Sequence, residues 1–249
     1  MMLLTGSLSR VPLPLLRWAP DPVVFVEPQE RAQYEEAHPD VRFVSLRKSG
    51  GGFGYLLNQM VRYTLDNDED FFVFTDDDVT DLRVRPNVGT KFSSCRGEHA
   101  RSVLAGSVSL ARELQCAQLA VSFAGQSWSA KKPFTDPSGA WGVHVTDARA
   151  IREVGGYDES IPCFNDWDMS ARLLISGFRC LRTNLVTFVH QMRSHEGGAE
   201  TVYKDKDRVA EAARRVASRY PQAARIVEVE AHGLSEVRFN WRQLIRGMQ

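Results

Sequence analysis

Short apolar runs alternate along the chain with segments whose apolar residues recur at helical spacing, a pattern typical of α/β proteins. Five runs bounded by polar or turn-forming residues are expected to form strands: 23–26, 41–46, 71–75, 139–145 and 185–190. A helical pattern over residues 29–37 lies between the first two runs, and this order suits a right-handed βαβ unit. The sequence therefore predicts an α/β fold, with a Rossmann-like, mostly parallel sheet flanked by helices.

The remaining segments indicate a single domain with an N-terminal arm and a C-terminal extension. Residues 1–21 are rich in proline and are expected to form an irregular, loosely attached arm. The long apolar pattern over residues 98–123 is typical of one long or two short buried helices. The main domain is expected over residues 22–202, and a charged helix with an edge hairpin is expected to pack on it over residues 203–249. Further helices are expected over residues 55–65, 148–154 and 165–175.

Composition excludes some classes of protein but does not change the expected fold. Of the 249 residues, 43% are hydrophobic and 25% are charged, which are ordinary fractions for a globular protein. The formal net charge is zero, so the chain has no global basic field for nucleic acid, although a local patch is not excluded. Four cysteines without a CxxC spacing argue against a zinc site or a disulfide framework. Neither a signal peptide nor a membrane-spanning run is recognised, so a cytoplasmic protein without membrane contact is expected.

Candidate chemistry centres on three consecutive carboxylates, Asp76, Asp77 and Asp78, which follow the apolar run 71–75 without a turn residue between them. Open α/β sheets bind ligands at the carboxyl ends of their strands, where this triplet is expected to lie. Adjacent carboxylates repel one another, and a divalent cation that prefers oxygen ligands, Mg²⁺ or Mn²⁺, relieves the repulsion. The alternative interpretation is a solvated acidic turn that closes the strand.

A glycine-rich loop and two histidines are expected near the same edge of the sheet. Residues 48–54 form a loop that opens onto a helix, where backbone N–H groups can hold phosphate. A flexible loop without function is the alternative interpretation. His190 ends the strand expected over residues 185–190, and His195 follows it, so both are candidate metal ligands.

A second acidic cluster, Asp166 and Asp168, stands at the start of the helix expected over residues 165–175. The presence of a second acidic cluster downstream of the triplet favours a functional interpretation of both clusters. Their alternative interpretation is a favourable interaction with the helix dipole. For Asp168, an ion pair with Arg172, four positions later, is a further alternative.

In combination, these motifs resemble those of the GT-A fold of nucleotide-sugar glycosyltransferases, over about residues 23–195. That family has an apolar strand leading into a DxD motif, then a GG-[FY]-D-E segment and an E-D-x-D-L-x-x-R helix. The matching segments are Asp76-Asp77-Asp78, Gly155-Gly156-Tyr157-Asp158-Glu159 and Asn165-Asp166-Trp167-Asp168-Met169-Ser170-Ala171-Arg172, with Asn165 where many relatives have Glu. Within this fold, the N-terminal half looks like the TET-associated glycosyltransferases. Those resemble base J glucosyltransferase and phage enzymes that attach sugars to hydroxymethylated pyrimidines in DNA.

The resemblance implies a role for each candidate residue. A divalent metal is expected at Asp78, aided by Asp76 and by His190 or His195. The donor, expected to be a UDP-sugar such as UDP-glucose, is assigned to the following residues: Glu27, Pro28, Gly52, Asn58, Asp76 and Asp77. Asp166 is the expected base that takes the acceptor's proton in an inverting transfer, with Asp168 as its alternative.

The acceptor implied by the resemblance is a hydroxymethylated pyrimidine in DNA, which requires a local basic surface. The loops after the acidic triplet offer these cations: Arg83, Arg85, Lys91, Arg96, Lys131 and Lys132. Two alternatives stay open. One is a glycosyltransferase that modifies protein or a cell-envelope polysaccharide, and the other is a non-catalytic module that binds a metal or a nucleotide. The intact acidic clusters argue against the module, because such a protein would be free to lose them.

Overall fold

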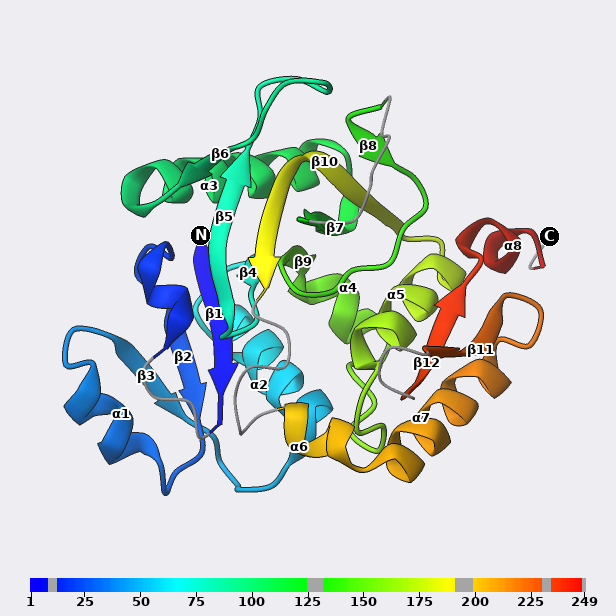
Figure 1. The fold of residues 1–249 in the computed structure, drawn as a ribbon, viewed down its shortest axis with the longest axis horizontal. Helices are drawn as coiled ribbons and strands as arrows, with labels where there is room; N and C mark the ends of the chain where they lie inside the picture. Colours follow the sequence, from blue (N-terminus) through cyan, green and yellow to red (C-terminus); the bar gives the residue numbers. More distant parts are fainter. Residues whose placement is uncertain (9–12, 125–131, 191–198, 230–233, 248–249) are drawn as a thin grey trace.

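A central sheet of ten strands runs through the molecule, with helices on both faces (Figure 1). The computed structural model describes residues 1–8, 13–124, 132–190, 199–229 and 234–247. The strands of the central sheet are β1 (Met2–Ser7), β2 (Val23–Val26), β3 (Arg42–Ser45), β4 (Phe71–Phe74), β5 (Val79–Val84), β6 (Ser93–Cys95), β7 (Cys116–Phe123), β8 (Phe134–Thr135), β9 (His144–Asp147) and β10 (Arg179–His190). A separate hairpin consists of β11 (Ala224–Val229) and β12 (Leu234–Phe239).

The helices vary from one turn to nearly five turns. They are η1 (Pro14–Arg17), a 3-10 helix, and α1 (Arg31–Ala37), α2 (Gly52–Asp66), α3 (Gly97–Glu113), α4 (Ala148–Glu153), α5 (Asn165–Ile175), α6 (Ala199–Lys204), α7 (Lys206–Arg219) and α8 (Trp241–Arg246). Among the described helices, none combines the length and the apolar character needed to cross a bilayer.

The order of strands in the sheet is β3-β2-β1-β4-β9-β7-β10-β5-β6, with β8 paired to β10 outside this path. Strands β3, β2, β1 and β4 are parallel to one another, and β7 is parallel to β10. Strand β9 is antiparallel to both of its neighbours, and β5 is antiparallel to β10 and β6. Most strands therefore run in one direction, which confirms the α/β fold with a mostly parallel sheet.

Each face of the sheet is covered by its own hydrophobic core. Phe72 and Phe74 of β4 belong to the core beneath α2, α4 and α5. Phe71 and Val73 belong to the core beneath α3 on the opposite face. Successive residues of a strand point to opposite faces, so a strand covered on both sides is apolar at every position. This explains why Phe71–Phe74, the strand before the acidic triplet, contains no polar residue.

The start of the chain differs from the expected irregular arm. Residues 2–7 form β1 at the centre of the sheet, between β2 and β4, and Leu3 and Leu4 are buried. Prolines at positions 12 and 14 dominate the local sequence pattern. A central strand is instead defined by its partners, and β4 lies about seventy positions further along the chain.

Residues 116–123 were expected to be helical but form β7, a buried strand between β9 and β10. Helix α3 ends at Glu113, and Gln115 takes a φ of 51° in the turn that follows. A continuous apolar run fits a buried helix as well as a buried strand, so the periodicity alone did not separate them. The other expected strands and helices of the main domain are present, although β9 begins five residues later than predicted.

Residues 199–247, here called the C-terminal module, comprise α6, α7, the β11–β12 hairpin and α8 (Figure 1). The charged helix expected after residue 203 is interrupted at Asp205, which caps α7 by accepting a hydrogen bond from the backbone N–H of Arg208 (3.0 Å). The hairpin forms its own two-stranded sheet and not an edge of the central one. Val209 and Leu234 join the core that also contains residues of α5, so the module packs on the main domain.

Candidate functional site

Three potential metal ligands meet at the carboxyl end of β4. The Asp76–Asp78 turn leads directly into β5, and β10 lies antiparallel to β5 with His190 opposite Val79. His190 Nε2 lies 3.3 Å from Asp76 Oδ2 and 2.9 Å from Asp78 Oδ1. One ligand atom from each of these residues lies within 4.8 Å of the other two. The sheet thus brings His190 to carboxylates that precede it by more than a hundred positions.

The donor atoms of this cluster fit a divalent cation. Two carboxylate oxygens and one imidazole nitrogen converge, and this set suits Mn²⁺ or a similar first-row metal. The carboxylates also act on the imidazole. Burial alone would lower the pKa of His190, but hydrogen bonds to Asp76 and Asp78, together with their charges, raise it to about 10. The two acids therefore favour positive charge at the point where they meet.

Asp77 points away from the cluster, toward the end of β1. Its Oδ2 accepts a hydrogen bond of 2.6 Å from the Ser7 hydroxyl, whose oxygen lies 2.9 Å from the hydroxyl of Tyr34. Its backbone carbonyl accepts a hydrogen bond from the N–H of Leu15 (3.3 Å). Asp77 therefore lies at the junction of β1, η1 and α1, whereas its two neighbours face the potential metal site.

Glu27 and the glycine-rich loop lie at the same edge of the sheet as the metal ligands, because β2, β3 and β4 are parallel. The Glu27 carboxylate accepts hydrogen bonds from the backbone N–H of Gly50 (2.7 Å) and from the side chain of Gln29. Gly52 begins α2 with a φ of 75°, which glycine adopts without strain. Pro28 is exposed beside Glu27. These residues form one connected rim next to the cluster.

Asn58, also expected to contact the donor, is hydrogen-bonded to the segment over residues 155–159. Its Oδ1 accepts from the N–H of Tyr157 (2.7 Å), and its Nδ2 donates to the carbonyl of Tyr157 (3.0 Å). A Cβ at Gly156 would lie 2.9 Å from Asn58 Oδ1, and Gly156 has a φ of 78°, so glycine is required there. Asn58 therefore joins α2 to this segment.

Asp166 lies in the first turn of α5, close enough to Asp76 to sense its charge. Its carboxylate accepts a hydrogen bond from the N–H of Trp167 (2.9 Å) and is half-buried. Burial raises the pKa of Asp166 to about 7, and the negative charge of Asp76 contributes to the increase. A carboxylate with a pKa near neutrality is suited to accept a proton at physiological pH.

Asn165, which stands where many relatives have Glu, binds the loop that precedes this turn. Its Nδ2 donates to the carbonyls of Asp158 (2.9 Å) and Ile161 (3.0 Å). A glutamate carboxylate at this position could not donate either hydrogen bond. The asparagine thus attaches the start of α5 to the preceding loop.

Asp168 is fully buried and bound by three side chains. Its Oδ2 accepts from Arg172 Nε (2.9 Å), and its Oδ1 accepts from Arg219 Nη1 (2.9 Å) and from the Tyr220 hydroxyl (3.0 Å). The expected ion pair with Arg172 is therefore present. Because Arg219 and Tyr220 come from the C-terminal module, Asp168 joins α5 to that module and does not face the metal ligands.

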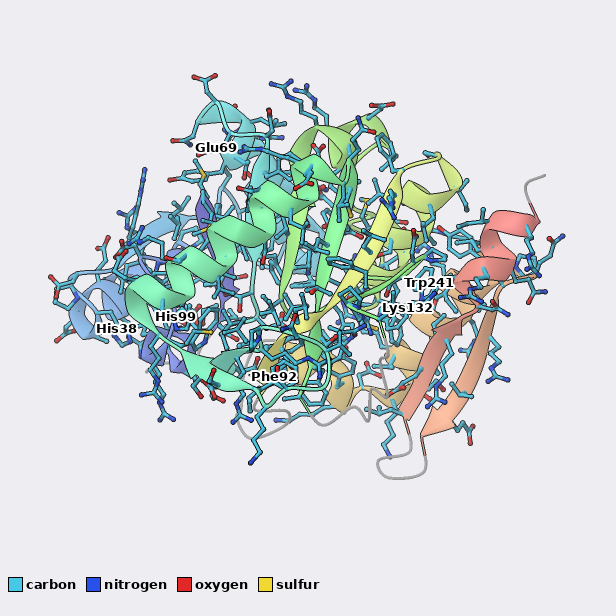
Figure 2. All side chains as sticks on the ribbon, turned by 90° about the horizontal axis from the view of Figure 1, so that it is seen from above. His38, Glu69, Phe92, His99, Lys132 and Trp241 are labelled. Carbon is cyan, nitrogen blue, oxygen red and sulfur yellow. The ribbon has the colours of Figure 1, made fainter. Side chains whose placement is uncertain are left out.

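Two of the predicted residues, His195 and Lys131, lie outside the described residues, and their roles stay predictions. The described part of the expected basic surface follows β5 away from the cluster. Arg83 pairs with Asp81 (2.7 Å), and the guanidinium of Arg85 lies 4.7 Å from the centre of the Phe92 ring. Phe92, which marks this surface, lies well apart from Trp241 at the start of α8 (Figure 2). The expected basic surface is therefore separate from α8.

Tyr203 of α6 was given no role from the sequence, although the structure places it near the site. Tyr203 is 39% exposed, and partial burial together with the charges of Asp166 and Asp76 raises the pKa of its hydroxyl. A lone tyrosine in a charged helix carries no local signal of such a position, because both acids precede it by many residues. Only the three-dimensional arrangement identifies it.

Comparison with known proteins supports the fold that these features define. No protein-family profile and no curated protein matches the sequence. The structure of S. aureus TarS 1–349 in complex with UDP-GlcNAc matches all of this chain and 71% of that chain, with 11% identity and a TM-score of 0.57. A second S. aureus TarS structure matches over 88% of this chain and 39% of that chain, with 10% identity and a TM-score of 0.52. GalNAc-T7 with UDP, GalNAc and Mn²⁺ matches with a TM-score of 0.49 over 76% of this chain and 43% of that chain, at 10% identity.

The two TarS similarities, together with the sheet topology, show that the chain has the GT-A fold of nucleotide-sugar glycosyltransferases. At these levels of identity they establish the fold and not the reaction. The residues at the carboxyl end of the sheet must carry the argument for function.

Proposed function

We propose that the protein is a metal-dependent glycosyltransferase that moves a sugar, glucose or a similar hexose, from a UDP-sugar to a hydroxyl group. One observation carries the proposal: Asp76, Asp78 and His190 converge at the carboxyl end of β4 in a GT-A fold. Sheets of this type bind ligands at that edge. An acidic turn that only ended a strand would not require a histidine from β10 beside its carboxylates.

Asp76, Asp78 and His190 would hold the divalent metal, and we propose Mn²⁺ in preference to Mg²⁺. Mg²⁺ favours oxygen ligands in octahedral geometry, whereas an imidazole nitrogen in the set favours a first-row transition metal. When bound, the metal would stabilise the negative charge on the leaving nucleotide diphosphate. The second candidate histidine, His195, would be available as a further ligand or a contact to the donor.

The donor would lie along the rim formed by Glu27, Pro28 and the glycine-rich loop. Glu27 holds Gly50 through its backbone N–H, which fixes the loop where it enters α2. The N-terminus of α2, at Gly52, offers backbone N–H groups to a diphosphate. Asp77 would act indirectly, because its hydrogen bond to Ser7 fixes the turn that carries Asp76 and Asp78.

Asp166 would be the base that takes the proton from the acceptor hydroxyl in an inverting transfer. Its pKa of about 7 and its proximity to Asp76 support this role. Asp168 has its carboxylate occupied by Arg172, Arg219 and Tyr220, so we propose a positioning role for it.

The acceptor that we propose is the hydroxymethyl group of a modified pyrimidine in DNA. This assignment depends on the resemblance of the motifs to the TET-associated glycosyltransferases. Such a base must leave the helical stack, or belong to a single strand, to reach a site at the edge of the sheet.

A donor-hydrolysis assay tests the proposal. UDP release is measured with several UDP-sugars in the presence of Mn²⁺, Mg²⁺ or EDTA, for the wild type, Asp78→Ala and the control Asp70→Ala. Asp70 precedes the other end of β4 and pairs with Arg149. We expect release that requires the metal, is faster with Mn²⁺, and is lost in Asp78→Ala but not in the control. Addition of hydroxymethylated DNA should then produce glycosylated DNA. No release and no metal-dependent UDP binding would contradict the proposal and favour a non-catalytic module.

A further inference from the structure

The zero net charge of the chain conceals a positive C-terminal segment. Residues 203–249 contain ten basic and six acidic residues, a net charge of +4, whereas residues 1–202 carry a net charge of −4. Such an asymmetry between two parts of a chain indicates interaction with a polyanion. The arrangement of the charges in the hairpin and in α8 shows where on the C-terminal module a polyanion would bind.

Two arginines stand directly opposite each other in the hairpin. The register pairs Arg225 of β11 with Arg238 of β12, and both side chains are exposed. Within the part of the chain that the structure describes, no carboxylate lies within ion-pair distance of either guanidinium. Like charges in this position destabilise a hairpin. An external anion would remove the repulsion.

A second pair of like charges lies in the neighbouring helix. Arg242 and Arg246 are four positions apart in α8, where like charges also repel. Both are exposed, and the described residues provide no acidic partner for them. The hairpin and α8 therefore present four arginines that form no ion pair with any of the described residues, although Glu236 lies two positions from Arg238 in β12.

A hollow of about 510 Å³, widely open to solvent, lies between these elements. Arg225 and Arg238 line it, together with the side-chain amides of Gln222, Asn240 and Gln243. Guanidinium groups match the oxygens of a phosphate, and amides can donate further hydrogen bonds to it. The hollow thus has the chemistry of a phosphate site.

Half-buried aromatic rings connect this hollow with the proposed base. Phe239, which lines the hollow, is stacked with Trp241 at a centroid distance of 4.5 Å and with Trp167 at 6.1 Å. Trp167 directly follows Asp166 in α5. Proteins that bind single-stranded nucleic acid combine cations for the phosphates with aromatic faces for the bases.

From this arrangement we infer that Arg225 and Arg238 form a binding site for the phosphodiester backbone of a single-stranded nucleic acid. In the proposed function, this site holds the acceptor strand while its target base reaches Asp166. The site lies on the C-terminal module, and not on the loops after the acidic triplet where the sequence placed the basic surface.

Binding of a fluorescent single-stranded oligodeoxynucleotide, measured by anisotropy over a range of salt concentrations, tests the inference. The variant is R225Q/R238Q, and the matched control is R62Q/R152Q, which removes the same charge from exposed positions of α2 and α4. Each phosphate contact with a single strand contributes about 0.7 to the slope of log K against log salt. We expect the slope to decrease by about 1.4 and the affinity to fall roughly tenfold in R225Q/R238Q only.

Three further measurements make the test decisive. In thermal unfolding, the R225Q/R238Q variant should be at least as stable as the wild type, because the repulsion between the two arginines is relieved. An unchanged slope, or an equal loss in the control, would overturn the inference. Inorganic polyphosphate that displaced the oligonucleotide equally well at equal phosphate concentration would overturn the assignment to a nucleic-acid strand. Mn²⁺-dependent UDP binding should be the same in all variants, so failure of the proposed donor chemistry would be seen separately from failure of this site.

Discussion

Asp166 binds its proton more tightly than an ordinary aspartate because it is half-buried near another carboxylate. Its pKa is about 7 in the folded protein, whereas an aspartate in an unfolded chain titrates near 4. Between these values the folded protein holds a proton that the unfolded chain has released. The stability associated with neutral Asp166 is therefore complete below pH 4 and is lost as the pH rises through 7.

Replacement of Asp166 by Asn should reveal both the catalytic use of this carboxylate and its effect on stability. We expect kcat to fall by about 10²–10⁴, the usual contribution of a general base. The wild-type kcat/KM should rise with pH and become constant above about 7, and this rise should disappear in Asp166→Asn. Steady-state kinetics from pH 5 to 9 measure these effects.

The same variant should be more stable than the wild type at pH 8, because it removes an ionised carboxylate from a half-buried position. At pH 4 the difference should vanish, since the wild-type group is then neutral. Urea unfolding at the two pH values measures the difference. A gain of the same size at both would show that the charge of Asp166 has no part in it.

At the scale of secondary-structure elements, Asp168 connects two helices that are far apart in the sequence. It binds Arg172 within α5 and Arg219 at the end of α7. Arg219 also pairs with Asp158 in the loop before α5. The first turn of α5, which carries Asp166, is therefore held in place by the C-terminal module.

Replacement of Asp168 by Ala should leave Arg172 and Arg219 without their shared partner. Loss of one partner of a buried ion pair costs about 3–5 kcal/mol in the free energy of unfolding. Urea unfolding should show this loss, whereas the control Asp207→Ala, at an exposed position of α7, should lose less than about 1 kcal/mol. A stable Asp168→Ala protein with kcat reduced as strongly as in Asp166→Asn would instead assign Asp168 to the reaction.

Strand β1 gives a second prediction at this scale. Leu4 is completely buried between β2 and β4, so Leu4→Ala should reduce the free energy of unfolding by about 2–5 kcal/mol. In a loosely attached arm the same substitution would have little effect. Urea unfolding of Leu4→Ala, with Ile226→Ala as an exposed control, distinguishes the two arrangements.

At the scale of the whole molecule, the sequence was most informative where a local pattern and its environment agreed. The run Phe71–Phe74 is apolar because both faces of β4 are covered, and the Asp76–Asp78 turn follows from its end. His190 could be placed near the acids because it ends a strand. By contrast, β1 and β7 depend on partners that lie far along the chain, which local periodicity does not report.

The candidate site shows the same difference between what local patterns predict and what depends on distant segments. Local motifs identified Asp76, Asp78 and Asp166, but not that Asp77 would turn toward Ser7 or that Asn58 would hold Tyr157. These outcomes depend on which loop arrives beside each side chain. The arginine pair of the hairpin was also beyond local patterns, since only the strand register places Arg225 opposite Arg238.

The separation of the metal ligands along the chain has a consequence for the order of events during synthesis. His190 follows Asp78 by 112 positions. Ribosomes add about 5–20 residues per second, so His190 is synthesised at least about 5 s after the two acids. His190 is also delivered by β10, which needs β5 and β7 already in position. Tight capture of the metal is therefore among the last steps of maturation, and a newly made chain binds it fully only once its sheet is assembled.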